Sequence, residues 1–206
     1  MSTHRPVPSQ GERRLQGLLG TSAHADDFYD RQVHPCLTPS MREFIGLQTM
    51  MFLSTSDARG HCDSTFRGGP PGFVTVVDDV TLAYPEYRGN GVMASAGNIT
   101  ENPFAGLLFM DFTRDHIGLH VNGQAHLVGD ADMRAAHPLM PEDTAPGRRP
   151  EMWVRISVHE AYVHCSKHIP HLEPAFRPGR RSSERPKDGE YFTEQAAVPS
   201  GSFGKA

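Results

Sequence analysis

Short runs of alternating apolar and polar residues, each closed by a tight turn, recur along the middle of the chain. The runs MMFLSTSD at 50–57 and HCDSTF at 61–66 meet at the polar turn DARG, a pattern typical of a β-hairpin. The runs FVTVV at 73–77 and VTLAYP at 80–85 flank the turn DD in the same way. Such repeated hairpin patterns predict a sheet whose neighbouring strands run antiparallel.

Further strands and a few helices follow from the same reasoning. The runs AGLLFMDF, GLHVNGQAHLV and WVRISVHEAYVHC bring the expected total to about seven strands. A helix is expected to start at Thr38-Pro39, with Met41, Phe44 and Ile45 as its apolar stripe. Residues 91–103 predict a short helix ended by Asn102-Pro103, and residues 133–151 contain a helix-like piece and a loop. This spacing favours a mainly β (α+β) fold, a closed or nearly closed antiparallel barrel.

The ends of the chain differ in composition from the middle. Residues 1–25 are rich in Pro, Gly, Ser and Arg, which indicates a flexible N-terminal arm. Residues 172–206 have few apolar side chains and many helix and strand breakers, so we expect a polar C-terminal tail. A single barrel domain is expected between them, over residues 26–171.

Charge and cysteine content exclude several classes of protein. The formal net charge of −4 gives no general attraction to nucleic acid or to an anionic membrane. No run of 18 apolar residues suggests a transmembrane helix, and the N-terminus lacks the apolar core of a signal peptide. The three cysteines form no CxxC pair, which favours a reducing compartment. We therefore expect a cytoplasmic protein.

The stretch YRGNGVMASAGN at 87–98 is the first candidate site. Its glycines precede the start of a helix, where unpaired backbone N–H groups and a partial positive charge favour anions. Arg88 adds a full charge suited to phosphate oxygens, and Ser95 and Asn98 supply further donors. The alternative is that these residues form only a tight turn before the helix, with Arg88 exposed to solvent. Arg67, at the end of the strand DSTFR, favours the anion site if the barrel brings both segments together.

The middle of the chain resembles the pyridoxamine 5'-phosphate oxidase-like flavoproteins. The resemblance covers roughly residues 28–171 and rests on SDARGHCDSTFRGGPPGFV, on the frame GN…S…N…NP…GLLF and on VNGQAHLV, in this order. It implies an FMN-binding split β-barrel that forms a homodimer with flavin at the interface. It also implies an FMN-dependent oxidoreductase acting on a small molecule, with catalytic residues, substrate and electron donor unassigned.

The resemblance also implies which residues hold the cofactor. The strand Ser64, Thr65, Phe66, Arg67 resembles the one whose backbone lies along the flavin ring. Tyr84 and Pro85 match the strand end against the flavin, and Arg88, Asn90, Ser95 and Asn98 match the turn on the phosphate side. The RxVLLK strand of the true pyridoxamine phosphate oxidases is absent, which argues against vitamin B6 activity.

The stretch AYVHCSKHIPH at 161–171 allows three interpretations. Its histidines and Cys165 invite a zinc site, but they alternate along a strand end without paired ligand spacing, so we expect no metal. Lys167 or His168 beside the flavin is one alternative, and an ordinary surface strand end is the other. For the whole chain, the alternatives to FMN chemistry are an F420-dependent reductase of the same fold, a flavin- or haem-binding module without catalysis, and a purely structural dimer.

Overall fold

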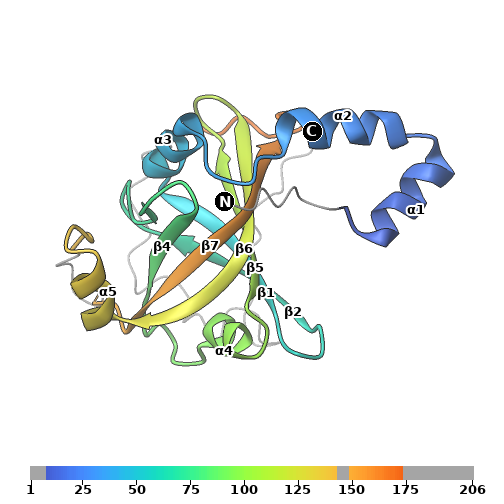
Figure 1. Ribbon diagram of the computed structural model, residues 1–206. Helices are drawn as coiled ribbons and strands as arrows, with labels where there is room; N and C mark the ends of the chain where they lie inside the picture. The colour runs from blue at the N-terminus through green and yellow to red at the C-terminus, as the bar shows by residue number, and fades with distance from the viewer. Residues whose placement is uncertain (1–7, 143–148, 174–206) are drawn as a thin grey trace, which may run out of the picture. The chain divides into compact units, whose positions relative to one another are not determined.

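The computed structural model describes residues 8–142 and 149–173, and the strands in them form one antiparallel sheet (Figure 1). The chain divides into two compact units, residues 1–172 and 173–206, and every element named below belongs to the first. Within the described residues the strands are β1 (Met50–Ser56), β2 (Cys62–Gly68), β3 (Thr75–Val76), β4 (Thr81–Glu86), β5 (Phe104–Asp111), β6 (Ile117–Gly129) and β7 (Met152–His164). Beyond Glu173, the expected polar tail lies outside the described residues.

The strands follow the order β2-β1-β5-β6-β7-β4-β3 across the sheet. The edge strands β2 and β3 share no backbone ladder within the described part of the chain, so the barrel is open along this seam. The expected mainly β fold, a split antiparallel barrel with a few short helices, is confirmed. The fully closed form of that barrel is excluded, because the two edges of the sheet are not hydrogen-bonded to each other.

Both predicted hairpins are present, although one is shorter than expected. In the first, Ser56 pairs with Cys62, and Gly60 takes a positive φ of 85° that closes the DARG turn. Asp57 accepts backbone hydrogen bonds from His61 and Arg59, and these bonds lower its pKa to about 2. The second hairpin keeps only two residues of β3, because the Phe73 amide donates to the Pro70 carbonyl in a turn instead of to a neighbouring strand.

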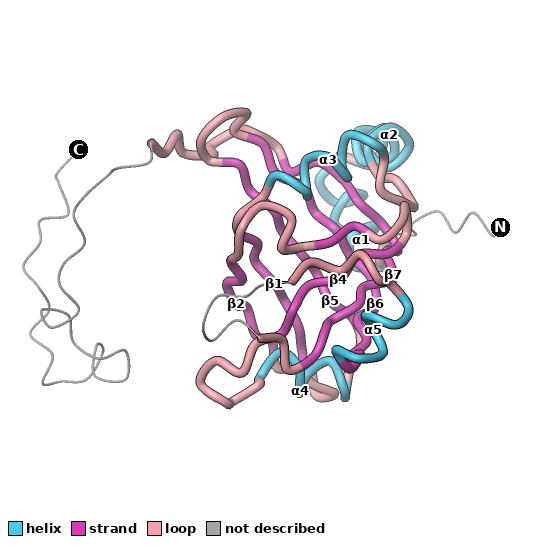
Figure 2. Tube along the Cα trace, turned by 90° about the vertical axis from the view of Figure 1, so that its left-hand side faces the viewer, coloured by secondary structure: helices cyan, strands magenta, loops and turns pink. Residues whose placement is uncertain are grey.

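Five described helices accompany the sheet (Figures 1 and 2). They are α1 (Gln10–Leu19), α2 (Ser22–Gln32), α3 (Pro39–Leu47), α4 (Ala94–Glu101) and α5 (Asp130–Ala136). The first two, α1 and α2, extend away from the sheet to the right in Figure 1. Thr38 caps α3 by accepting a hydrogen bond from the Met41 amide at 3.3 Å, as its Thr-Pro start predicts. α3 and α4 lie at opposite ends of the barrel in both views. No described helix has the length and apolar character needed to cross a bilayer.

The described part of the expected N-terminal arm contains α1 and the start of α2, two helices that the sequence analysis did not predict. Ser9 and Glu12 form a capping box, in which each side chain accepts a hydrogen bond from the other's backbone amide. Gly20 then ends α1 in the left-handed region at φ 69°. Composition concealed this signal, because the capping box depends on two residues at the right spacing and not on overall polarity.

Strand alternation decides which side chains fill the barrel. On β1, Met51 and Leu53 are fully buried, and residues of the opposite parity face outward. On β2 the inner positions carry the polar residues Asp63, Thr65 and Arg67, all half-buried. Burying such groups requires partners, and the partners of these three define a site at the open seam.

Candidate functional site

A cavity of about 430 Å³ lies where β2, the end of β4 and the start of α4 meet. The sequence predicted that the bend within residues 88–98 and the strand carrying Arg67 lie together, and the structure places both around this cavity. The predicted residues that line it are Thr65, Phe66, Arg67, Pro85, Arg88, Asn90 and Ser95.

Arg67 projects from the inner face of β2 and links it to β4. Its Nη2 donates to Oε2 of Glu86 at 2.8 Å, and its Nη1 donates weakly to Oγ1 of Thr65 at 3.4 Å. The Arg67 Nε atom is buried and has no hydrogen-bond partner among the described residues. Glu86 itself is only 6% exposed, and burial raises the pKa of its carboxyl while the Arg67 charge opposes that rise.

Tyr84 lies in β4, two residues before Glu86, and is fully buried. Burial, with the nearby Glu86 charge, raises the pKa of the Tyr84 phenol, so the phenol stays neutral and can donate a hydrogen bond. Its hydroxyl has no partner within the described residues. Tyr84 is not itself part of the cavity wall, whereas Pro85, next to it, is. The hydroxyl nevertheless lies beside Arg67, whose charge opposes the rise in the Tyr84 pKa, so both groups belong to the same corner of the barrel.

The bend at 87–93 presents the start of α4 to the cavity. Gly89, Gly91 and Met93 all take positive φ values, and Asn90 Oδ1 fixes the bend by accepting the Val92 amide at 3.0 Å. Met93 occupies the N-cap position and offers no side-chain acceptor to the first amides of the helix. The uncapped end of α4 is therefore suited to an anion.

Ser95 and Asp63 join α4 to β2 beside the cavity. Ser95 is 3% exposed, and its hydroxyl donates to Oδ2 of Asp63 at 3.0 Å. The Asp63 carboxylate thus faces the positive end of the helix, where negative charge is favoured. Ser95 fixes the position of the helix start in addition to lining the cavity.

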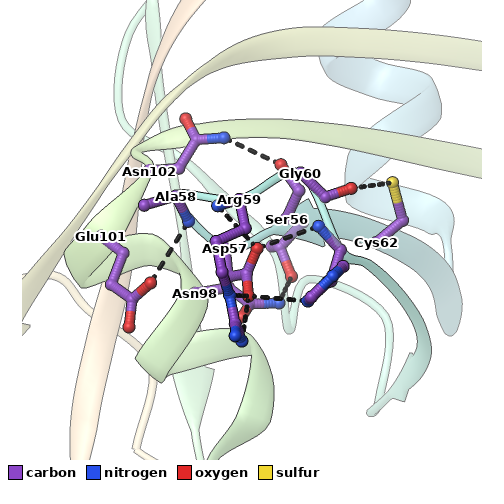
Figure 3. Close-up of polar contacts among 11 residues, drawn as sticks. Ser56, Asp57, Ala58, Arg59, Gly60, Cys62, Asn98, Glu101 and Asn102 are labelled. Carbon is purple, nitrogen blue, oxygen red and sulfur yellow. Dashed lines mark hydrogen bonds and ion pairs between the residues drawn. The ribbon is translucent and has the colours of Figure 1, made fainter.

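Asn98 holds α4 against the first hairpin and does not line the cavity (Figure 3). Its Nδ2 donates to Oγ1 of Thr55 at 3.1 Å, and one turn later Asn102 Nδ2 donates to Oγ of Ser56 at 2.8 Å. The Ala58 amide in the hairpin turn donates to Glu101 at 3.2 Å. These bonds fix the orientation of α4, so the contribution of Asn98 to the site is positional.

A family model described as pyridoxamine 5'-phosphate oxidase matches residues 37–165, which include β1 to β7 and the whole cavity. The chain belongs to the pyridoxamine 5'-phosphate oxidase family. No match is found among curated proteins.

Several solved structures are similar to this chain at low sequence identity. HupZ from Group A Streptococcus is 20% identical, with a TM-score of 0.45, over 66% of this chain and 98% of that one. An FMN-binding protein from Syntrophomonas wolfei is 13% identical, with a TM-score of 0.47, over 73% and 96%. HutZ, the haem storage protein from Vibrio cholerae, is 14% identical, with a TM-score of 0.43, over 62% and 94%. Proteins this distant need not share an activity.

A second, wider cavity of about 1000 Å³, here called the outer groove, lies along β1, β2, β5, β6 and β7. Ser64 lines this groove, as do Ser54 on β1, Gly106 on β5, and Asn122 on β6, whose Nδ2 donates to Glu160 at 2.8 Å. The groove and the seam cavity share Asp63 in their walls. Sequence reasoning missed the groove, although small and polar residues at outward positions of several strands were its signal.

Lys167 is the predicted site residue that lies far from the cavity. β4 meets β7 through the pairs Tyr84–Val154 and Pro85–Trp153, at the beginning of β7. Lys167 follows the opposite end of β7, which runs from Met152 to His164, and its amide donates to Cys165 Sγ. Within one chain, Lys167 and the phosphate-side bend do not meet.

The histidines at that end of β7 form a pair instead of a metal cluster. His120 Nε2 and His164 Nδ1 lie 2.9 Å apart, and the His120 ring stacks on Tyr162. Burial and the neighbouring His164 lower the pKa of His120. Among the described residues, no three His, Cys, Asp or Glu side chains converge as metal ligands.

The residues at the seam fit a flavin with a phosphate tail. The unpartnered Arg67 Nε atom, the charge of Arg88 and the uncapped start of α4 provide for an anion. The adjoining groove is large enough for an aromatic ring system. Two carboxylates, Asp63 and Glu86, also line the cavity, and their charge has to be compensated when an anion enters.

Proposed function

We propose that this chain binds FMN and acts as a flavin-dependent oxidoreductase on a small molecule. Family membership supports the class of cofactor. The observation that carries the proposal is the seam cavity, in which the uncapped start of α4 and an unpartnered buried Arg67 nitrogen face one space. Backbone amides and arginines at a helix start are the groups that bind phosphate in many nucleotide sites.

The residues have separable tasks in this proposal. Arg88 and the first amides of α4 bind the phosphate, while the bend fixed by Asn90 lets the backbone approach it. The backbone of β2 would lie along the ring, and Tyr84, behind the cavity wall, would position the Arg67 guanidinium. When bound, FMN supplies hydride or single-electron transfer. Arg67, in the wall of the same cavity, adds a second guanidinium to the phosphate site.

We also propose that the active form is a cytoplasmic homodimer. The outer groove is open along one side, and a second copy of the chain would close it over the ring. Lys167, which lies far from the cavity of its own chain, would then reach the cofactor of its partner. A dimer would also cover Phe104, which is 56% exposed at the rim of the groove.

The first experiment identifies the ligand of the purified protein. We expect a yellow protein with flavin absorbance, from which denaturation releases a compound with the mass of FMN. A compound with the mass of F420 or of haem would replace our proposal by one of the alternative cofactors. A colourless protein that also fails to bind added FMN would refute flavin binding.

The second experiment separates an enzyme from a carrier and tests the dimer. Flavin reduction and reoxidation are followed with NADH or NADPH as donor and with oxygen as acceptor. Turnover supports the oxidoreductase, whereas a protein that holds FMN without reacting with either nucleotide or with other donors is a carrier. Light scattering gives the mass in solution, and a monomer in the FMN-bound state would contradict the proposed closing of the groove.

A further inference from the structure

Glu86 is a buried acid in a cavity that otherwise suits an anion. Its carboxylate bonds Arg67 at 2.8 Å, and its side chain is 7% exposed against 23% for Arg67. No backbone ladder joins the two strands that carry this pair within the described residues. Glu86 therefore already binds the guanidinium that a phosphate in the cavity would be expected to contact.

The geometry of the pair makes a phosphate and Glu86 competitors. A guanidinium grips a phosphate with two parallel N–H bonds, through either Nε and Nη2 or Nη1 and Nη2. Both of these edges include Nη2, the nitrogen that already donates to Glu86. A phosphate at either edge of Arg67 thus comes close to the Glu86 carboxylate, and two like charges in a buried site repel each other strongly.

The repulsion can be relieved by a proton. We propose that Glu86 takes up one proton from solvent when a phosphate group binds at Arg67, which makes Glu86 a proton-linked gate of the phosphate site. The carboxylate becomes a neutral carboxyl, and its O–H can donate to a phosphate oxygen in place of the lost ion pair. This inference rests on the proposed function, because FMN is the ligand that brings the phosphate.

The groups around Glu86 allow this assignment. Arg67 on β2 binds it directly, and Arg88 of the bend lines the same cavity. Tyr84 stays neutral, because burial raises its pKa. On β7 the residue opposite Glu86 is Met152, which does not titrate.

Asp63 is the other acid in the cavity, and its surroundings differ from those of Glu86. Its carboxylate accepts a hydrogen bond from Ser95 at 3.0 Å, beside the start of α4. The Glu86 carboxylate is held by Arg67 instead, and burial raises its pKa even in the presence of this charge. Glu86 is therefore the acid whose partner a phosphate at Arg67 would contact.

Calorimetry of FMN binding tests the gate. Titrations in buffers of different ionisation heat give the number of protons taken up per FMN bound, for the wild type, for Glu86→Gln and for Glu43→Gln. Glu43 is an exposed acid of α3, outside both cavities, and serves as the matched control. Riboflavin, which has the ring without the phosphate, is titrated alongside.

We expect Glu86→Gln to take up about one proton fewer than the wild type with FMN, and Glu43→Gln to match the wild type. We expect Glu86→Gln to bind FMN about tenfold more tightly at neutral pH, because it has no carboxylate that repels the phosphate. The wild type should take up more protons with FMN than with riboflavin, a comparison that remains informative if Glu86→Gln fails to fold.

Three outcomes would overturn the gate. Suppose that Glu86→Gln and the wild type both bind FMN tightly and take up the same number of protons. This result would refute the proposed gate without contradicting FMN binding. Equal proton uptake with FMN and riboflavin in the wild type would do the same. A wild type that binds neither FMN nor inorganic phosphate would refute both the gate and the proposed function.

Discussion

The Arg67 guanidinium lies 2.8 Å from the Glu86 carboxylate and joins two strands that share no backbone hydrogen bond. The pair closes the seam of the split barrel with side chains at the place where a closed barrel would use a ladder. It also brings β2 and β4 to the same cavity, so one contact serves the fold and the candidate site.

Removing Arg67 should destabilise the protein more than removing the charge of Glu86. Arg67→Ala leaves a buried carboxylate unpaired, and we expect a loss of about 3 kcal/mol in the free energy of unfolding. Glu86→Gln keeps a hydrogen-bonding side chain and should cost less. Urea denaturation of both variants checks the order, and equal losses would mean that the pair is solvated and contributes little.

The stability difference between Glu86→Gln and the wild type should depend on pH. Because burial raises the pKa of Glu86 above its ordinary 4.5, the folded state holds this proton more tightly than the unfolded state. The Glu86 contribution to stability is therefore largest at low pH and is lost as the pH rises through the folded-state pKa. Unfolding free energies measured from acid to neutral pH should move in favour of Glu86→Gln. A constant difference would show that Glu86 has an ordinary pKa.

Tyr84→Phe should affect stability and cofactor binding in opposite directions. The Tyr84 hydroxyl is buried without a partner in the described residues, so its removal should leave the ligand-free protein unchanged or more stable by about 1 kcal/mol. FMN affinity should fall, because the hydroxyl is proposed to position the Arg67 guanidinium from behind the cavity wall. Thermal unfolding without ligand and flavin titration separate the two effects, and an unchanged FMN affinity would take Tyr84 out of the site.

Arg88→Ala should weaken FMN binding without affecting the fold. Arg88 is exposed, and it forms no ion pair with any described residue, so its loss removes charge from the cavity and little packing. We expect about a tenfold loss of FMN affinity, a weaker dependence on salt and no change for riboflavin. Arg42→Ala, on the exposed side of α3, is the control. A parallel loss for riboflavin would place Arg88 at the ring instead of the phosphate.

The bond between Asn98 and Thr55 should couple α4 to β1 measurably. A double-mutant cycle with Asn98→Ala and Thr55→Val gives the interaction energy, which we expect to be about 1 kcal/mol. Asn98→Ala should also lower FMN affinity by shifting the start of α4. Additive effects of the two substitutions would mean that the helix is held mainly by its other contacts, such as the Asn102–Ser56 bond.

The hairpins and the α3 start were predictable because their signals are local. The DARG turn and the Thr38-Pro39 cap depend on residues within a few positions of one another. The α1 capping box is equally local, and it was missed because the segment was judged by composition. The outer groove needs four strands to assemble before its small outward residues share a surface, so no single stretch of sequence indicates it.

The candidate site was predictable as two segments but not as a network of contacts. The residue types of the stretch 87–98 and of the strand DSTFR indicated an anion site. The family resemblance implied that both segments lie near one cofactor. Glu86 escaped notice, since an acid at a strand end is ordinarily a surface residue. Only the position of β2 across the seam buries it against Arg67.

The sequence by itself determined the antiparallel hairpins, the turn that presents a helix start and the family to which the chain belongs. These features depend on backbone preferences and side-chain alternation over a few residues. The tertiary structure decided that Arg67 meets Glu86, that Asn98 anchors a helix and that Lys167 lies at the far end of β7. Such contacts join residues distant in the chain, and their strength depends on burial, which exists only once the sheet has curled.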